Sequence, residues 1–557
     1  MLNFLKNKTT ITQLSIILLG LLLFLPGLGN VHLFDWDEIN FAESAREMIN
    51  SGNYLTVQIN FEPFWEKPPL FIWFQVLSMK IFGINEFAAR FPNAICGIAT
   101  LLTLFNIGKT LKNYRFGILW VLLYVGSIFP FFYFKSGIID PWFNLFIFLG
   151  IYFFARFTSA ERKGNGYNFL MFSGLFLGLS ILTKGPAGLL IFLLSFGIYL
   201  IATKFKWNYT WKHVAVFSSI LIFVGSFWFL LQILMGNSKI IEDFIVYQIR
   251  LFQTKDAGHG GFLLYHFAIL FIGVFPASIL ALPTFRSSII KQETDTNTQN
   301  VFRWMMITFW VVLILFTIVK TKIVHYSSMC YFPLTFFAAW YCDKLLTEKK
   351  KFPKTMQVLL IALAVLFGIA TIIVTLFDKI KQYLIPYVKD AYTAGSMQAT
   401  STWTGFEPII GLLLIATTIT FCLQINKIKK LRTFAILTIG SLFFTWITML
   451  LVVPQVEKYS QRATIEFYES KKGENCYIYP ISRSYAHYFY SDRQAKNNCA
   501  DKEFLMHGNI DKTCYFVLKN KTGRVDKFMS DVPDAIKLYE KNGYAFLVRH
   551  PKKQLIK

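Results

Sequence analysis

The stretch HLFDWDEINFAESAREM (residues 32–48) follows the first long apolar run of the chain, and four of its carboxylates come soon after that run. They are Asp35, Asp37, Glu38 and Glu43. Carboxylates beside a membrane edge are costly unless they are paired, cap a helix or serve chemistry. A carboxylate held there could accept a proton from a hydroxyl group, as a general base does. We therefore treat this stretch as the first candidate site.

The same stretch also contains a signature of a helix start. Asp35 followed three residues later by Glu38 matches a capping box, so capping and function remain alternatives for these two residues. Asp37 is not used by such a cap, and we expect it to face a cavity. From Asp37 onward, apolar residues recur at helical spacing and polar residues take the other side. This pattern predicts a short amphipathic helix lying on the membrane surface.

Lysines at the ends of apolar segments form a second group. Lys67 lies before two prolines in EPFWEKPPLFIWF, and Lys184 lies in LTKGPAG. Lys322 lies in KTKIVHY, which also carries His325 and Tyr326. A single lysine of this kind is usually explained by snorkelling of its amine to the interface. Several such groups on one side of the membrane indicate a shared anionic ligand.

Two further stretches add polar residues on that side. Asp140 in KSGIIDPWFN begins an apolar segment, where N-capping and function are alternatives. The stretch YQIRLFQTKDAGHGGF (247–262) carries Arg250, and His259 between glycines, as suits a loop that approaches a ligand. Glu66 and His259 could lie near a divalent ion, but no spacing typical of metal ligands indicates one. A divalent cation therefore stays possible, and no cofactor is required.

The elements that position these residues follow from composition. The chain has 557 residues, 54% hydrophobic and 18% aromatic, and runs of about twenty apolar residues recur along it. This is typical of a polytopic helical membrane protein, and the absence of alternating strands of about ten residues excludes a barrel. Lys and Arg number 56 against 32 Asp and Glu. Basic cytoplasmic loops explain that excess, so no nucleic acid is expected as a partner.

The apolar pattern predicts about thirteen transmembrane helices. We expect them near 11–29, 87–108, 114–133, 139–156, 168–183, 186–203, 213–235, 262–282, 302–319, 324–341, 356–377, 408–424 and 433–453. Every second connection is rich in Lys and Arg, which places the N-terminus in the cytoplasm. The predicted domains are then a membrane domain, 1–453, whose first outer loop is 30–86, and an outer domain, 454–557. The expected location is the inner membrane, with the C-terminal domain in the periplasm.

Residues 454–557 predict a small α/β domain. CYIYPI, YAHYFY, CYFVLKN and YAFLVRH are typical of short strands, and DVPDAIKLYEKNG of a helix. Cys476, Cys499 and Cys514 would face an oxidising compartment, so one disulfide is expected, with its pairing open.

These motifs carry a resemblance. The stretch DWDEINFAESAREM followed by FEPFWEKPPLFIWF resembles the first outer loop of membrane glycosyltransferases of the GT-C class. More narrowly, it is similar to the lipid A aminoarabinose transferases and the dolichyl-phosphate-mannose protein mannosyltransferases. IIDP, LTKGP, GHGG and TKIVHY extend the likeness over most of the chain. One departure is Asn40, where the aminoarabinose transferases have Arg.

The resemblance implies catalysis on the outer face with a polyprenyl-phosphate-linked sugar as donor. It matches Asp37 to the catalytic aspartate, Lys67, Lys184 and Arg250 to positions near the donor phosphate, and Tyr326 to an aromatic residue there. The full set of candidates is Asp37, Glu38, Glu43 and Asp140 as catalytic residues, Lys67, Lys184, Arg250, Lys322 and Tyr326 as phosphate ligands, and Glu66, His259 and His325 as further site residues.

Residues and resemblance together predict an inverting glycosyltransferase. A carboxylate would deprotonate the acceptor, and cations would hold the departing lipid phosphate. The expected partners are the donor, membrane lipid and an envelope acceptor, which is a lipid A-like glycolipid, another glycan or a protein. The alternative is a transporter or flippase of an anionic lipid or solute. It predicts charged residues at mid-membrane and paired broken helices, whereas the span centres are almost free of charge.

Overall fold

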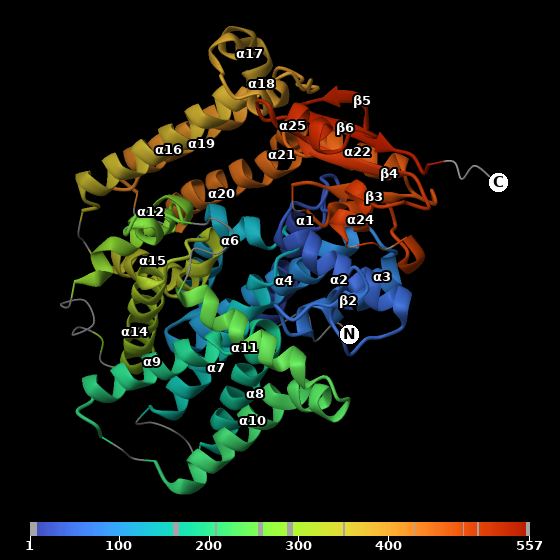
Figure 1. The fold of residues 1–557 in the computed structure, drawn as a ribbon. Helices are drawn as coiled ribbons and strands as arrows, with labels where there is room; N and C mark the ends of the chain where they lie inside the picture. Colours follow the sequence, from blue (N-terminus) through green and yellow to red (C-terminus); the bar gives the residue numbers. More distant parts are fainter. Residues whose placement is uncertain are drawn as a thin grey trace.

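The fold is known from a computed structural model of the chain (Figure 1). It describes residues 8–159, 166–206, 209–253, 260–286, 293, 295–348, 351–428, 431–482, 484–497, 499 and 501–552, with the backbone alone for 251–253. The chain is a multi-pass helical membrane protein with a small C-terminal α/β domain, so the predicted fold class is confirmed.

Each of the thirteen predicted apolar segments is helical. The helices of the first half are α1 Lys8–Phe24, α4 Glu86–Leu111, α5 Tyr114–Val125 with α6 Ile128–Tyr133, α7 Asp140–Phe157, α8 Tyr167–Lys184, α9 Ala187–Ala202 and α10 Trp211–Leu234. Those of the second half are α12 Tyr265–Gly273 with α13 Ala277–Ala281, α14 Thr296–Ile318, α15 Tyr331–Thr347, α16 Lys354–Thr375, α19 Pro408–Gln424 and α20 Leu431–Ile447. Within the described ranges, six helices are long and apolar enough to cross a membrane by themselves.

One predicted span is not straight. The segment expected at 262–282 contains α12 and α13, and the angle between α12 and the helical segment Ala277–Phe285, which starts with α13, is 107°. The break contains Pro276, which lacks a backbone N–H and cannot continue the hydrogen-bond ladder of a helix. Proline is therefore the physical reason for this difference from the predicted span.

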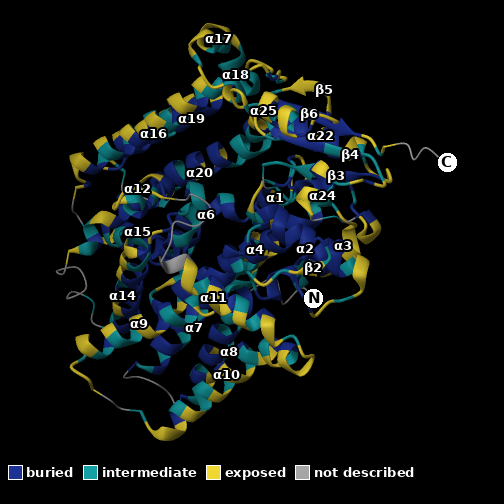
Figure 2. Cartoon of the chain, in the orientation of Figure 1, coloured by how far each residue is buried: buried dark blue, intermediate teal, exposed yellow. Residues whose placement is uncertain are grey.

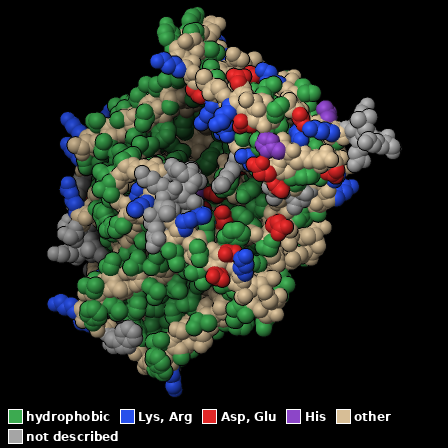
Figure 3. Space-filling model, viewed as in Figure 1, with side chains coloured by type: hydrophobic (Ala, Val, Ile, Leu, Met, Phe, Trp, Pro, Cys, Tyr) green, Lys and Arg blue, Asp and Glu red, His purple; other side chains and the backbone are tan. Residues whose placement is uncertain are grey.

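The membrane helices pack closely through small residues. A Cβ atom added to Gly178 of α8 would lie 2.7 Å from Val224 of α10, and one added to Gly174 would lie 2.8 Å from the Phe217 carbonyl. Small residues of this kind let two membrane helices approach at their backbones. Large apolar side chains on α9, α10 and α16 point outward instead, and hydrophobic atoms cover most of the visible face over these helices (Figure 3). Such a surface suits contact with lipid chains.

The first outer loop folds into α2 Asp37–Ser51, a hairpin of β1 Gln58–Ile59 and β2 Glu62–Pro63, and α3 Leu70–Phe82. Helix α2 begins at Asp37 as predicted. Its N-cap residue is Trp36, which makes no side-chain capping hydrogen bond, so the predicted capping box of Asp35 and Glu38 is wrong. The prediction of a surface helix is also wrong. Residues 38–48 of α2 are all buried because the C-terminal domain covers the polar side (Figure 2).

The C-terminal domain contains a four-stranded sheet of order β3-β4-β6-β5. Strand β3 Tyr477–Pro480 is parallel to β4 Cys514–Lys519, and β6 Tyr544–Arg549 is antiparallel to β4 and to β5 Ile536–Lys541. Short helices surround the sheet: α21 Val453–Glu457, α22 Arg462–Ser470, α23 Ala486–Tyr490, α24 Lys502–His507 and α25 Arg524–Asp531. In Figure 1 this domain lies beside α2 and α3.

Three predictions in this domain are corrected. YAHYFY forms α23 rather than a strand, and its apolar residues pack on α2 and α22. DVPDAIKLYEKNG contains strand β5 rather than a helix, because Asn542 and Gly543 form the two-residue turn of the β5–β6 hairpin. Both turn residues have positive φ, as the favoured hairpin turns require. The expected disulfide is not formed: Cys476, Cys499 and Cys514 are free thiols.

Three helices lie in connections where none was predicted. They are the amphipathic α11 Ser238–Gln253, and α17 Phe377–Leu384 with α18 Ala391–Met397 between α16 and α19. Helix α11 contributes to the site described below, and α18 lies against β6 of the C-terminal domain.

Candidate active site

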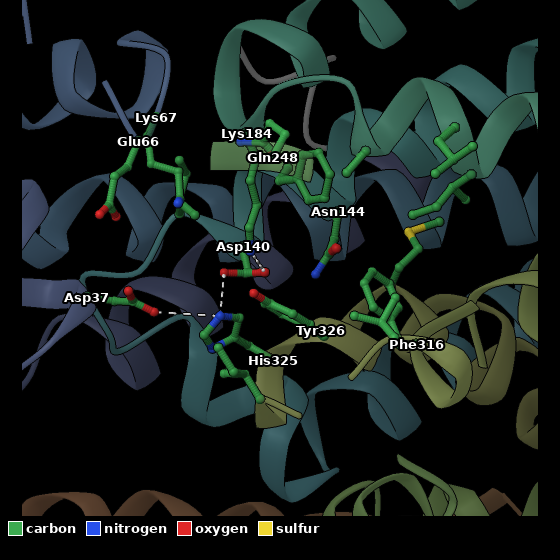
Figure 4. A pocket seen from close by; sticks show the side chains of 18 of the residues that line it. Asp37, Glu66, Lys67, Asp140, Asn144, Lys184, Gln248, Phe316, His325 and Tyr326 are labelled. Carbon is green, nitrogen blue, oxygen red and sulfur yellow. Dashed lines mark hydrogen bonds and ion pairs between the residues drawn. The ribbon is translucent and has the colours of Figure 1, made fainter. Parts of the chain in front are cut away.

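A cavity of about 310 Å³ brings most of the candidate residues together (Figure 4). Its polar residues come from the start of α2, the turn before α3, the start of α7, the end of α8, helix α11 and η4 Val324–Cys330. Seven of the twelve candidates line it: Asp37, Glu66, Lys67, Asp140, Lys184, His325 and Tyr326. The cavity therefore joins segments separated by up to nearly three hundred residues.

Asp140 and Lys184 form a buried ion pair at the centre of the cavity. Asp140 is the first residue of α7, Lys184 is the last residue of α8, and Lys184 Nζ lies 2.7 Å from Asp140 Oδ1. Gly185, at φ 85°, ends α8 and lets the chain turn at once into α9. Asp140 Oδ2 is buried and, within the described part of the chain, makes no hydrogen bond. One oxygen of this carboxylate is thus held and the other remains available.

His325 lies between the two aspartates. Its Nε2 is 3.6 Å from Asp37 Oδ2 and 3.9 Å from Asp140 Oδ2, and in Figure 4 the two carboxylates approach it from different sides. The next turn of η4 is fixed because Asn144 of α7 donates a hydrogen bond of 2.7 Å to Ser328 Oγ. The Asp37 side chain is 36% exposed, against 3% for Asp140. Asp37 is therefore the carboxylate that a ligand in the cavity reaches more easily.

Lys67 and Arg250 lie around the ring of Tyr247 in α11. The Lys67 Nζ is 5.0 Å and the Arg250 guanidinium carbon 5.2 Å from the ring centroid. Burial lowers the pKa of the Lys67 amine, although the carboxylates of Glu66 and Asp37 act in the opposite direction. A buried amine of this kind gains from an anionic ligand, which restores its charge. Lys67 is therefore suited to a phosphate group.

The rest of the cavity wall is apolar and lies toward the membrane helices. It is made by side chains of α9, the end of α14 and the segment after it: Leu190, Ile191, Leu315, Phe316, Val319, Ile323 and Met329. Tyr326 lies between the two parts, because its ring is 5.4 Å from Lys184 Nζ and 5.3 Å from the Phe316 ring. The cavity is thus amphipathic, with charges at one end and hydrocarbon at the other.

Four described candidates lie outside this cavity. Glu43 is fully buried and receives two hydrogen bonds from Arg46, of 2.7 and 2.8 Å. Lys322 Nζ donates to the carbonyls of Phe316 and Thr317 at the end of α14. Arg250 is exposed beside the cavity. The fourth, Glu38, is described next, and His259 lies outside the described residues.

Glu38 forms a buried pair with Arg90 of α4, with Arg90 Nη2 2.8 Å from Glu38 Oε2. Burial favours the neutral carboxyl, but the Arg90 guanidinium outweighs it and holds the pKa of Glu38 below its usual value. Glu38 also accepts hydrogen bonds from the backbone amides of Phe34 and Gly137. These contacts fix the start of α2, next to Asp37, against the membrane helices. The role of Glu38 here is to position its neighbour.

Arg90→Ala tests this arrangement. Removing one partner leaves the Glu38 charge buried, and such losses typically cost about 3–5 kcal/mol. We expect a large drop in the thermal unfolding midpoint of the purified protein. Lys537→Ala is the control, because its pair with Glu540 is exposed and exposed pairs contribute about 0–1 kcal/mol. Equal midpoints for the two variants would contradict this role of the pair.

The C-terminal domain holds the other end of α2. Arg46 is fully buried and donates to Asp492 Oδ1 at 3.0 Å and to the Arg493 carbonyl at 2.9 Å. In the segment before α2, the backbone amide of Leu33 donates a hydrogen bond to the Tyr490 hydroxyl of the C-terminal domain. The helix that carries Asp37 is therefore fixed between the membrane domain and the C-terminal domain.

Sequence reasoning missed several residues of the cavity. Asn144 lies one helical turn after Asp140, and this i, i+4 spacing could have placed both on one face. Tyr247 lies three residues before Arg250 in the amphipathic pattern of α11, a segment where the sequence analysis expects a loop. Asn40 is buried beside Trp36, and its amide can be oriented to bond the backbone carbonyl and indole N–H of Trp36, which lines the cavity. Groups of three or more His, Cys, Asp or Glu placed to hold a metal ion do not occur among the described residues.

Comparisons with known proteins agree with the resemblance. A family model described as dolichyl-phosphate-mannose-protein mannosyltransferase matches residues 66–229. An undecaprenyl phosphate-alpha-4-amino-4-deoxy-L-arabinose arabinosyl transferase from Wigglesworthia glossinidia brevipalpis is 27% identical over 362 residues, 64% of this chain and 62% of that protein. The protein of the same name from Edwardsiella ictaluri is 28% identical over 57% of each chain. The matched segments thus span about three fifths of these relatives.

The likeness in three dimensions covers nearly the whole chain. The crystal structure of ArnT from Cupriavidus metallidurans bound to undecaprenyl phosphate superposes with a TM-score of 0.77. The sequence identity is 15%, and the match covers 97% of this chain and 99% of ArnT. The apo structure of the same protein gives a TM-score of 0.76. The two chains therefore share one fold, including the C-terminal domain.

Proposed function

We propose that this chain, which has the GT-C fold of ArnT and resembles the aminoarabinose transferases in sequence, is an inverting glycosyltransferase. It takes a sugar from a polyprenyl-phosphate carrier and moves it to a hydroxyl group of an envelope glycolipid. The observation that carries this proposal is the amphipathic cavity, where Asp37, Asp140, Lys67 and Lys184 meet beside an apolar wall.

The two ends of the cavity fit the two parts of such a donor. A polyprenyl chain is hydrocarbon and suits the wall formed by α9, the end of α14 and Met329. Its phosphate suits the cations at the other end, where Lys184 lies near Tyr326 and Lys67 near Tyr247. Undecaprenyl phosphate is the carrier named for the relatives and for the bound ArnT structure, and we propose the same carrier here.

The residues then divide the chemistry between them. Asp37 accepts the proton of the acceptor hydroxyl while that oxygen forms its bond to the anomeric carbon. The bond from this carbon to the phosphate oxygen breaks, and its electron pair leaves with the polyprenyl phosphate. The negative charge on the phosphate grows as it departs, and Lys67 and Arg250 stabilise it. Attack from the side opposite the phosphate inverts the anomeric centre.

Asp140 and His325 position the reacting groups. The Asp140 carboxylate holds Lys184 at 2.7 Å, which keeps that amine at the phosphate end of the cavity. His325 Nε2 lies within 4 Å of both aspartates and keeps them apart in fixed places. The positive charge of Lys184 is already paired with the Asp140 carboxylate, so Lys67 is the cation that contributes most to binding the donor.

The orientation follows from the charge of the connections. Asp140 of the cavity begins α7, whereas the basic Arg156 lies in the last turn of that helix, and basic connections remain in the cytoplasm. We propose that the cavity and residues 454–557 face the periplasm, with the N-terminus inside. The carrier then reaches the cavity from the outer leaflet of the inner membrane. The comparisons give no support to a transporter or flippase.

Mass spectrometry of the envelope tests the proposed function. Lipids and glycoproteins from cells with and without the chain would be compared species by species. We expect one envelope glycolipid to lose a single sugar, of one defined mass, when the chain is absent, and the size of that loss identifies a pentose or a hexose. Identical glycans in both cells would contradict a glycosyltransferase.

A further inference from the structure

A second cavity, of about 440 Å³, lies between the C-terminal domain and the segment that leads into α2. Its walls come from α18, α22, the segment after β3, and strands β4 and β6. The lining includes Asp35, Tyr392, Ser482, Lys519 and Tyr544. None of these residues has a part in the chemistry proposed above.

This cavity adjoins the catalytic cavity. Asp35 lines both, and the next two residues, Trp36 and Asp37, line the catalytic one. The Trp36 ring packs on Tyr485 of the C-terminal domain, with 5.0 Å between ring centroids. The separation between the two spaces is therefore the thickness of one chain segment, and that segment carries the proposed base. A molecule in the second cavity therefore contacts the chain at Asp35, two residues before Asp37.

The groups that line the second cavity suit a carbohydrate. The Tyr392 and Tyr544 hydroxyls lie 3.1 Å apart, and their rings pack edge to face at 5.3 Å. Amphipathic rings of this kind offer an apolar face together with a hydrogen-bonding tip, as sugars do. Ser482 Oγ is buried and has no hydrogen-bond partner among the residues that the structure describes. A buried hydroxyl without a partner indicates a group that a ligand would satisfy.

The charges in this cavity favour an anionic substituent on that carbohydrate. Lys519 Nζ lies 5.0 Å from the Tyr392 ring centroid, and Lys519 and Asp35 line the cavity with charges of opposite sign. Lys519 belongs to β4, and Asp35 belongs to the segment that also lines the catalytic cavity, so the two charges give the space a direction. An anionic group would lie at Lys519, and free hydroxyls would point toward Asp35 and the base beyond it.

A third cavity, of about 330 Å³, differs in character. It is lined mainly by apolar side chains, and its charged groups are already paired: Glu38 with Arg90, and Lys135 with the carbonyls of Phe24 and Pro26. Such a lining offers few groups to a sugar. Among the described cavities next to the active site, the one at Lys519 is the better carbohydrate site.

We infer that the cavity at Lys519, Tyr392 and Ser482 binds the carbohydrate headgroup of the acceptor through an anionic substituent. This inference rests on the proposed function and adds to it the place and the chemical class of the second substrate. The C-terminal domain is then part of the acceptor site, and the segment 35–37 separates acceptor from donor until a hydroxyl reaches Asp37.

The test is a transfer assay with the full chain in nanodiscs. Donor would come from a lipid extract of cells lacking the chain, and the envelope glycolipid fraction of the same cells would be titrated as acceptor. Lys519→Met should raise the half-saturating amount of this fraction at least tenfold and leave binding of undecaprenyl phosphate unchanged. Tyr392→Phe, which removes only a hydroxyl, should raise it by a smaller factor. Lys527→Met is the control, because Lys527 is an exposed cation of the same domain.

The outcomes separate the two proposals. If Lys519→Met and Tyr392→Phe both show the same half-saturating amount of acceptor as Lys527→Met, the cavity is not the acceptor site, although the transferase function stands. If Lys519→Met also loses undecaprenyl phosphate binding, the protein is altered as a whole, and Tyr392→Phe decides. If the wild-type chain transfers no sugar at all, the proposed function fails and this inference fails with it.

Discussion

Asp37→Asn is expected to reduce sugar transfer by about 10²–10⁴-fold, the usual contribution of a general base. The amide is nearly the same size as the carboxylate but cannot accept the acceptor proton. Donor binding should change little, because the proposed phosphate ligand is Lys67 and not Asp37. The measurement is the transfer rate of the purified variant at saturating donor, together with its affinity for undecaprenyl phosphate.

A matched control separates loss of the base from loss of a carboxylate elsewhere. Glu503→Gln removes a charge from an exposed residue of α24, far along the chain from the cavity. This variant should transfer at the wild-type rate. If Asp37→Asn retained wild-type activity, Asp37 would not be the base, and the assignment of roles in the cavity would have to be abandoned.

Lys67→Met is expected to weaken binding of undecaprenyl phosphate by about tenfold to a hundredfold. Hydrogen bonds to charged groups typically contribute about 1.5–3 kcal/mol, which corresponds to that range. The effect should exceed that of Lys184→Met, because Lys184 is already paired with Asp140. Native mass spectrometry of the protein with added undecaprenyl phosphate measures the bound fraction directly. Equal losses for the two variants would contradict the unequal roles of the two lysines.

The same site predicts a dependence on pH. Burial lowers the pKa of Lys67, so wild-type protein should lose its charge there, and with it donor affinity, at a lower pH than an exposed lysine would. Lys67→Arg stays charged over this range and should keep its affinity as the pH rises. A parallel decline of wild type and Lys67→Arg would show that another group titrates.

Much of the membrane domain could be predicted from the sequence because the pattern is local. A run of about twenty apolar residues needs no information from the rest of the chain to form a membrane helix. The bend between α12 and α13 shows the limit of this reasoning. Pro276 indicates where a helix must break, but the angle depends on what packs around it.

In the C-terminal domain two local signals compete in the stretch 531–543. The pair Asn542-Gly543 lies between two stretches of alternating residues and is typical of a two-residue hairpin turn. The same stretch is also typical of a helix, because glycine is common just after the end of a helix. For YAHYFY the local signal was misleading: aromatic residues favour strands, but these pack against α2 and α22 as a short helix.

The arrangement of the site could be predicted only in part. Residue types marked Asp37, Lys67, Asp140 and Lys184 as candidates, and the structure places all four in one cavity. The pairing of Asp140 with Lys184, across 44 residues, depends on how α7 and α8 pack. Glu38, Glu43 and Lys322 looked equivalent to the others in the sequence. Their partners are Arg90, Arg46 and the end of α14, and only tertiary structure reveals them.

The burial of α2 is a further example. Its polar face looked suited to water because the residues that cover it, including Asp492 and Arg493, lie more than four hundred positions later. No local pattern could show that the C-terminal domain folds back over this helix. The consequence is functional, since the helix that carries Asp37 is fixed by the same contacts.

The most direct test of the account is the balance of products in a single reaction. Purified protein in nanodiscs would be given a lipid extract from cells lacking the chain, and mass spectrometry would count the undecaprenyl phosphate released and the glycolipid that has gained one sugar. We expect equal amounts of the two from the wild-type chain, and neither above background from Asp37→Asn. Sugar transfer without release of undecaprenyl phosphate, or equal products from both proteins, would contradict the proposed donor or the proposed base.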